Sequence, residues 1–77
     1  MLTSEQIRAA RMLLRWDQKD LAASSKLSLA TIKRLETQPG LVRANEVTVA
    51  AITRAFLDAG VEFTNGAAPG VRLRPAR

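Results

Sequence analysis

QKDLAASSKLSLATIKRLE, residues 18–36, carries the strongest structural signal in this chain. Its apolar positions predict two short helices, at about 18–24 and 29–37, packed across a tight bend. The residues expected to meet across the bend are Leu21, Ala22, Leu27, Ile32 and Leu35. Ala22 is small enough to let the two helices approach closely beneath Ile32. The residues expected to lie outside are Ser28, Leu29, Ala30, Thr31, Lys33 and Arg34.

Both helices of this stretch have a residue suited to start them. Asp17 precedes the first and Ser28 the second, and each side-chain oxygen can accept a hydrogen bond from a free backbone amide of the first turn. Three residues further on stand Asp20 and Thr31, neither of which is Glu or Gln. A full capping box with one of those residues is therefore expected at neither helix.

An earlier helix is predicted over residues 4–14. Thr3 and Gln6 match a capping box at its start, and its apolar stripe consists of Ile7, Ala10 and Leu14. The pattern breaks at Trp16, the single tryptophan. We interpret Trp16 as an anchor in the core between helices rather than as a side chain that stacks on a nucleic-acid base.

A fourth helix is predicted from the cap Asn45 through Asp58, with Gly60 as its C-terminal stop. Its inner face would carry Val49, Ile52, Phe56 and Ala59. The preceding helix must end before Gln38-Pro39-Gly40, because proline and glycine together interrupt a helix. A short loop over 41–44 then joins the two helices.

After Gly60 the apolar pattern changes to alternation, which predicts two short strands. Their inward residues would be Val61, Phe63, Val71 and Leu73. Pro69 cannot donate to a ladder, so we expect a wide loop over about 64–70. Because an isolated two-stranded ribbon is marginal in water, we expect the strands to lie on the fourth helix and to pair with those of a second copy, with these four residues in the dimer contact. The alternative is an unpaired, partly frayed tail.

The composition excludes several classes of protein. The 77 residues form one small unit, in which we distinguish a helical part, 3–59, and a strand segment for dimerisation, 60–77. Without Cys or His the chain lacks the usual zinc ligands, and we expect no metal and no cofactor. Without Tyr as well, little acid–base or nucleophilic chemistry remains, so we do not expect an enzyme. We expect no small-molecule ligand, because the small core is filled by its own side chains.

Charge and hydropathy point to a partner and a location. The formal net charge is +5, which favours polyanions, although charge alone fits a membrane surface as well as nucleic acid. No apolar run approaches the length of a membrane span, and the first residues lack the pattern of a secretory signal. We therefore expect a cytoplasmic protein without membrane attachment.

Several ordered motifs resemble the Cro/CI-type (XRE) family of helix-turn-helix transcriptional regulators. They are Arg8-Ala9-Ala10-Arg11, Trp16 to Ala22, Leu27-Ser28, Ala30-Thr31-Ile32 and Leu35-Glu36. The resemblance covers about residues 3–58 and implies a lambda-repressor-like bundle of four helices. The segment after Gly60 resembles a tail of short bacterial members, which adds a C-terminal pair of short β-strands to a mainly α fold.

The resemblance assigns roles to single positions. Gln18 matches a residue that bonds a DNA phosphate and steadies the recognition helix, and Arg11 with Glu36 matches a structural ion pair. The family usually has glycine in the bend between the two helices, because the residue there often takes a left-handed backbone conformation. This chain has Lys26 at that position. A left-handed backbone at a non-glycine residue costs about 1 kcal/mol, while Lys26 places a cation near the proposed DNA surface.

The same resemblance implies double-stranded DNA as the partner. Dimerisation does not follow from it, because many members carry a fifth helix where this chain has the strand segment. We expect a homodimer on an inverted repeat because the base contacts of one recognition helix would not single out one site. The expected base-reading residues are Leu29, Ala30, Lys33 and Arg34, with Arg34 able to bond guanine at two atoms. The expected backbone contacts are Gln18, Lys26, Ser28, Thr31, Arg43 and Asn45, the last through nearby amides. Arg72, Arg74 and Arg77 are open between a DNA-backbone contact and a solvated face.

The sequence leaves one alternative function open. In this second hypothesis the chain is the antitoxin of a toxin–antitoxin pair, in which the strands or the fourth helix cover a protein partner and the helix-turn-helix regulates its own promoter. The operator, the direction of regulation and the target genes do not follow from the residues.

Overall fold

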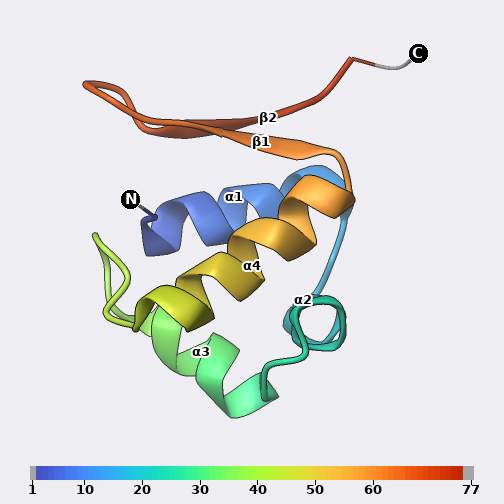
Figure 1. Cartoon of the computed structure of the whole chain (residues 1–77), viewed down its shortest axis with the longest axis vertical. Coiled ribbons are helices and arrows are strands. Elements are labelled where there is room, and N and C mark those ends of the chain that lie inside the picture. Colours follow the sequence, from blue (N-terminus) through green and yellow to red (C-terminus); the bar gives the residue numbers. More distant parts are fainter. Residues whose placement is uncertain (1, 76–77) are drawn as a thin grey trace.

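A computed structural model describes residues 2–75, which form four helices followed by a β-hairpin (Figure 1). The helices are α1 (Ser4–Leu14), α2 (Gln18–Ser25), α3 (Leu29–Thr37) and α4 (Glu46–Asp58), and the strands are β1 (Val61–Thr64) and β2 (Gly70–Leu73). This architecture confirms the expected mainly α bundle with a C-terminal strand pair. Within the described residues no helix is both long enough and apolar enough to cross a bilayer.

The start of α1 has the expected capping box. The Thr3 hydroxyl accepts from the Gln6 amide at 3.0 Å, and the Gln6 side-chain oxygen accepts from the Thr3 amide at 2.9 Å. The helix ends at Arg15, which has a left-handed backbone with φ 55°. Ile7 and Ala10 are buried and Leu14 packs against the core, as the apolar stripe predicted.

The start of α2 departs from the expectation. Asp20 takes the place of the usual Glu or Gln: its carboxylate accepts from the Asp17 amide at 2.9 Å, and Asp17 accepts from the Asp20 amide at 2.9 Å. α2 therefore has a full capping box, because the shorter carboxylate also reaches the free amide. α3 has only one half of such a box, in which Ser28 accepts from the Thr31 amide at 3.1 Å.

The bend between α2 and α3 consists of residues 26–28. Lys26 has the left-handed backbone that the family resemblance implied, with φ 60°. The buried Ser25 closes the end of α2 by donating to the Leu21 carbonyl at 2.7 Å. Ala22 is half-buried against the core, and Ile32 of α3 is fully buried. The small residue thus stands where the two helices meet.

The core is centred on Phe56 of α4. Its ring stacks with Trp16 at 5.7 Å between centroids and meets Phe63 of β1 edge-on, also at 5.7 Å. Phe56 and Ile52 have no exposed surface. These contacts confirm that Trp16 is a core anchor, and they include a strand residue in the same hydrophobic cluster.

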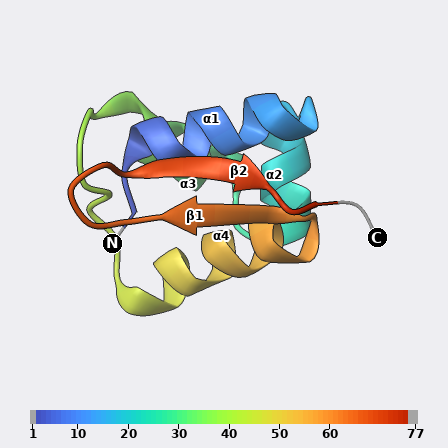
Figure 2. The same cartoon turned by 90° about the horizontal axis from the view of Figure 1, so that it is seen from above.

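The hairpin lies across both α1 and α4, as Figures 1 and 2 show. β1 and β2 are antiparallel, with Val61 opposite Leu73 and Phe63 opposite Val71, and the wide loop falls where it was expected. The prediction that the strands lie on the fourth helix was incomplete, because they also lie on α1, which contacts β2. The alternative of an unpaired tail was wrong for the residues described, and Arg77 lies outside them.

Three of the four strand residues predicted for the dimer contact are at least partly buried within their own chain. Val61 is completely buried in its own chain, and Phe63 and Val71 pack against the same core. Leu73 is half exposed, with 50% of its surface accessible. The inward side chains therefore serve this chain's own core first. A second copy would meet the hairpin through a backbone edge and Leu73.

Candidate nucleic-acid interface

The exposed face of α3 lies at the end of the molecule opposite the hairpin (Figure 1). Ile32, Leu35 and Glu36 point into the fold and are buried. The side chains of Ser28, Ala30, Lys33 and Arg34 are exposed, and those of Leu29 and Thr31 are half-buried. All six residues expected outside are accessible, so α3 offers one continuous outer face formed mainly by short polar and cationic side chains.

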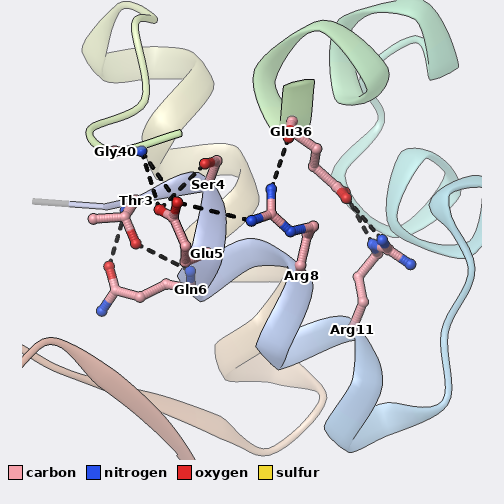
Figure 3. A network of polar contacts seen from close by, with 8 residues as sticks. All are labelled: Thr3, Ser4, Glu5, Gln6, Arg8, Arg11, Glu36 and Gly40. Carbon is pink, nitrogen blue, oxygen red and sulfur yellow. Dashed lines mark hydrogen bonds and ion pairs between the residues drawn. The ribbon is translucent and has the colours of Figure 1, made fainter. Parts of the chain in front are cut away.

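A buried ion pair fixes the C-terminal end of α3 to α1 (Figure 3). Arg11 contacts Glu36 through two hydrogen bonds, of 2.7 and 2.9 Å, and the Glu36 side chain is only 4% exposed. This confirms the expected pair and shows a bidentate geometry, which fixes orientation as well as distance. Arg11 also donates to the Trp16 carbonyl at 3.1 Å. Because Glu36 lies on α3, the pair sets the position of that helix.

A second arginine of α1 was not predicted to take part. Arg8 donates to the backbone carbonyl of Glu36 at 2.8 Å and so satisfies one of the free carbonyls at the end of α3. Its other nitrogen lies 3.8 Å from Glu5. The only sequence signal for this role is its place one turn before Arg11 on the same helix.

The loop after α3 is held against the first residues of the chain. Gly40 accepts from the Ser4 amide at 2.9 Å, and the Val42 amide donates to the Leu2 carbonyl at 2.9 Å. The Glu5 carboxylate accepts from the Gly40 amide at 3.1 and 3.3 Å (Figure 3). Hydrogen bonds from its own backbone amide and from that of Gly40 lower the pKa of Glu5 below its ordinary value. The loop is therefore fixed relative to α1.

One cleft lies between the start of α2 and the start of α3. It is lined by Asp17, Gln18, Lys19, Leu29 and Lys33. Three of the residues expected to contact DNA thus come together here from two helices. Lys19 was not singled out, although it is an exposed cation beside Gln18.

A second cleft, of about 250 Å³, lies between the end of α3 and the loop that follows. It is lined by Arg34, Leu35, Gln38, Leu41 and Arg43. Arg34 was expected to read a base and Arg43 to contact the backbone, yet the two line the same space. Within residues 2–75 neither forms an ion pair.

Other expected contact residues are placed differently. Lys26 is exposed in the bend. The Asn45 side-chain oxygen accepts from the Thr48 amide at 2.8 Å, so that oxygen is already used as a helix cap. On the hairpin, Arg72 pairs with Glu62 at 2.8 Å and Arg74 donates to the Leu57 carbonyl at 2.8 Å. These two arginines lie at the far end from α3, which favours the solvated face over a DNA contact.

In comparisons with protein-family models, curated proteins and solved structures, nothing matches this chain. The assignment of the surface around α3 therefore depends on its geometry and charge. Its cations are Lys19, Lys26, Lys33, Arg34 and Arg43, all exposed. Three carboxylates lie near this surface. Glu36 is paired with Arg11, and Asp17 and Asp20 each accept a hydrogen bond from a backbone amide at the start of α2. This arrangement suits a polyanion.

Proposed function

We propose that this protein is a sequence-specific DNA-binding regulator of the Cro/CI-type (XRE) class, with α3 as its recognition helix. The single observation that supports this most strongly is the form of α3: an accessible outer face, flanked by cations from two other segments, on a helix held by the buried Arg11–Glu36 pair. Lys33 and Arg34 on this helix are exposed, and no ion pair within the described residues involves them. Such a helix fits an external anionic partner.

The dimensions of α3 suit the major groove of B-DNA. That groove is about 12 Å wide, and an α-helix with its side chains is about 10–12 Å across. Ser28, Ala30 and Thr31 are short, so the first turns of α3 approach the base edges closely. Leu29 and Ala30 would contact thymine methyl groups, and Lys33 would donate to guanine. The cations on either side would bond phosphates.

A homodimer on an inverted repeat follows from the small number of base contacts. One recognition helix discriminates by only about 1–3 kcal/mol for each good contact, which does not single out one site in a genome. Two copies related by a twofold axis would read two half-sites about one helical turn apart. Such a regulator would act in the cytoplasm of a bacterial cell.

The position of the hairpin constrains how two copies would meet. Because the hairpin and α3 lie at opposite ends (Figure 1), stacking two hairpins face to face would point the α3 helices away from each other. Pairing the hairpins edge to edge would keep both α3 helices on one side. The β2 edge is favoured, since α1 packs beside β2 and these elements carry the exposed apolar side chains Met12, Leu13 and Leu73.

Selection from random duplex DNA tests the proposal. Purified protein should enrich a palindromic site, and its affinity for that site should fall steeply as salt rises. Lys33→Ala should lose preference at one position in each half-site. Arg54→Ala is the matched control, because Arg54 is an exposed cation of α4 that lines neither cleft, and it should select the same site with unchanged preference. A protein that enriches no sequence, or whose selectivity is the same after changes on α3, would contradict the proposal.

A protein partner is a second candidate, favoured by one observation. Val47, at the start of α4, is 79% exposed and Leu57, near its end, is 39% exposed, although both are large apolar residues. An antitoxin would cover such positions with its toxin. Co-expression with the product of the adjacent reading frame tests this. Val47→Asp should abolish a complex that wild-type protein forms, and absence of any complex with wild-type protein would contradict this second candidate.

A further inference from the structure

The two clefts described above lie on opposite flanks of the exposed face of α3. Leu29 and Lys33 line the cleft toward α2, whereas Arg34 and Gln38 line the cleft toward the following loop. Neighbouring residues on an α-helix are separated by about 100° of rotation, so the two pairs point in clearly different directions. Ala30 lies between these directions. With α3 in the major groove of DNA, the DNA backbone on each side of the helix would therefore contact a different set of side chains.

The chemistry of the two clefts differs. The cleft toward α2 contains the carboxylate of Asp17 together with Lys19 and Lys33. The cleft toward the loop contains no carboxylate: its polar side chains are two guanidinium groups and the amide of Gln38. Two arginines that line one space without a carboxylate give that space a positive potential, which favours an anion. This second cleft, which we call the arginine cleft, is the better anion site.

Both walls of the arginine cleft are fixed before any ligand binds. The α3 wall is held by Arg11 and Arg8, which bond the side chain and the carbonyl of Glu36. The loop wall, which leads to Arg43, is held by the Ser4–Gly40 and Leu2–Val42 backbone bonds. Because the backbone of both walls is held, the ordering cost of binding an anion is confined to the exposed side chains that contact it.

We propose that the arginine cleft binds one phosphodiester group of the DNA backbone, with Arg34 and Arg43 as its charged ligands and Gln38 as a further donor. This inference rests on the proposed function and changes one of its assignments: Arg34 becomes a phosphate ligand and ceases to be a base reader. Arg34 stands in the last turn of α3, whereas the first turns of a recognition helix reach the base edges. The guanidinium fork also matches the phosphate oxygens.

The test is the salt dependence of affinity for each of several duplexes. The duplexes are the site selected by wild-type protein and single-base variants of it, and the proteins are wild type, Arg34→Ala, Arg34→Lys and Lys33→Ala. Arg54→Ala is the control, because Arg54 is an exposed cation of α4 that lines neither cleft. Thermal melting of each variant confirms that it is folded.

A phosphate ligand and a base reader give different results. Arg34→Ala removes one phosphate contact from each subunit and therefore two from the proposed dimer. Binding to all duplexes should weaken by a similar factor, and the slope of log affinity against log salt should fall by about 1.8. Arg34→Ala is expected to behave in this way and Arg34→Lys to keep most of the slope. Lys33→Ala should change the ranking of the duplexes, and Arg54→Ala should change neither property.

Other results would overturn the inference. If Arg34→Ala alters the preference at one base position and keeps the slope, Arg34 is a base reader. If it changes neither property, the arginine cleft binds no phosphate. Wild-type protein that selects no site would instead overturn the proposed function, and the arginine cleft would fail with it. The two failures are thus distinguished by the wild-type measurement.

Discussion

The α3 end and the hairpin end of this protein use their arginines in opposite ways. At the hairpin, Arg72 and Arg74 bond a carboxylate and a carbonyl of their own chain. At the α3 end, Arg34 and Arg43 share an open cleft, and the described residues offer neither of them a carboxylate partner. A count of positive charges does not distinguish these ends. What matters is whether the fold has already supplied each cation with a partner.

The two ends also differ in how they are attached to α1. The α3 end is attached by charge, through the buried Arg11–Glu36 pair, and the hairpin is attached by the neutral amide of Gln6. Gln6 is 3% exposed and donates to the Thr64 and Gly70 carbonyls, each at 3.1 Å. One helix therefore holds both ends in place, by two interactions whose removal should have different consequences.

The largest effect is expected when the charged attachment is broken. Glu36→Ala removes both hydrogen bonds between Arg11 and Glu36. The Arg11 side chain is 15% exposed and keeps its bond to the Trp16 carbonyl, so we expect a loss of about 3 kcal/mol in the free energy of unfolding, the low end for a buried pair. Urea denaturation measures the loss. The double variant Arg11→Met with Glu36→Met is the control and should recover most of it, because two apolar side chains of similar size need no charge partner. A loss below about 1 kcal/mol in Glu36→Ala would show that the pair does not position α3.

Removal of the amide attachment should have a smaller and more local effect. Gln6→Ala leaves two carbonyls of the hairpin without their donor and should cost about 2 kcal/mol. Hydrogen exchange should show the strand amides losing more protection than those of α3. Thr3→Ala is the matched control, since it removes only the cap hydroxyl. It should cost about 1 kcal/mol and leave the relative protection of the strands unchanged.

A third variant separates backbone strain from binding. Lys26 and Arg15 both have left-handed backbones, with φ 60° and 55°, so replacing either by glycine should stabilise the fold by about 1 kcal/mol. Lys26→Gly should also weaken DNA binding, because it removes a cation from the bend before α3. Arg15→Gly should not. Equal DNA affinity of the two variants would exclude Lys26 from the proposed interface.

The smallest effect is expected from Glu5. Hydrogen bonds from its own amide and the Gly40 amide lower the pKa of Glu5 in the folded state. The ionised carboxylate therefore stabilises the fold above pH 4.5, the ordinary pKa, and this stabilisation is lost as the pH falls through the lowered pKa. In an NMR titration the Gly40 amide should follow this protonation, with a midpoint below 4.5. Glu5→Gln should remove that transition. A midpoint at or above 4.5 would contradict the hydrogen bonds between the Glu5 carboxylate and the Gly40 amide.

Most of the secondary structure was predictable from the sequence, but the arginine cleft was not. Helix starts at Thr3, Asp17, Ser28 and Asn45 depend on side chains that bond amides three residues away, and such local bonds are visible in the sequence. The capping box with Asp20 was not predicted, because Glu or Gln usually stands at this position, and the structure shows that the shorter carboxylate also reaches the amide. Arg34 and Arg43 belong to different segments, and their shared cleft depends on how the loop folds back.

The sequence by itself determined where each helix and strand begins and ends and the inward positions such as Ile32 and Phe56. These features depend on neighbours within about one helical turn or one strand alternation. Only the tertiary structure decided that Gln6 holds a hairpin 58 and 64 residues away and that this hairpin lies opposite α3. Contacts over such separations depend on how whole elements pack, and no local pattern encodes that packing.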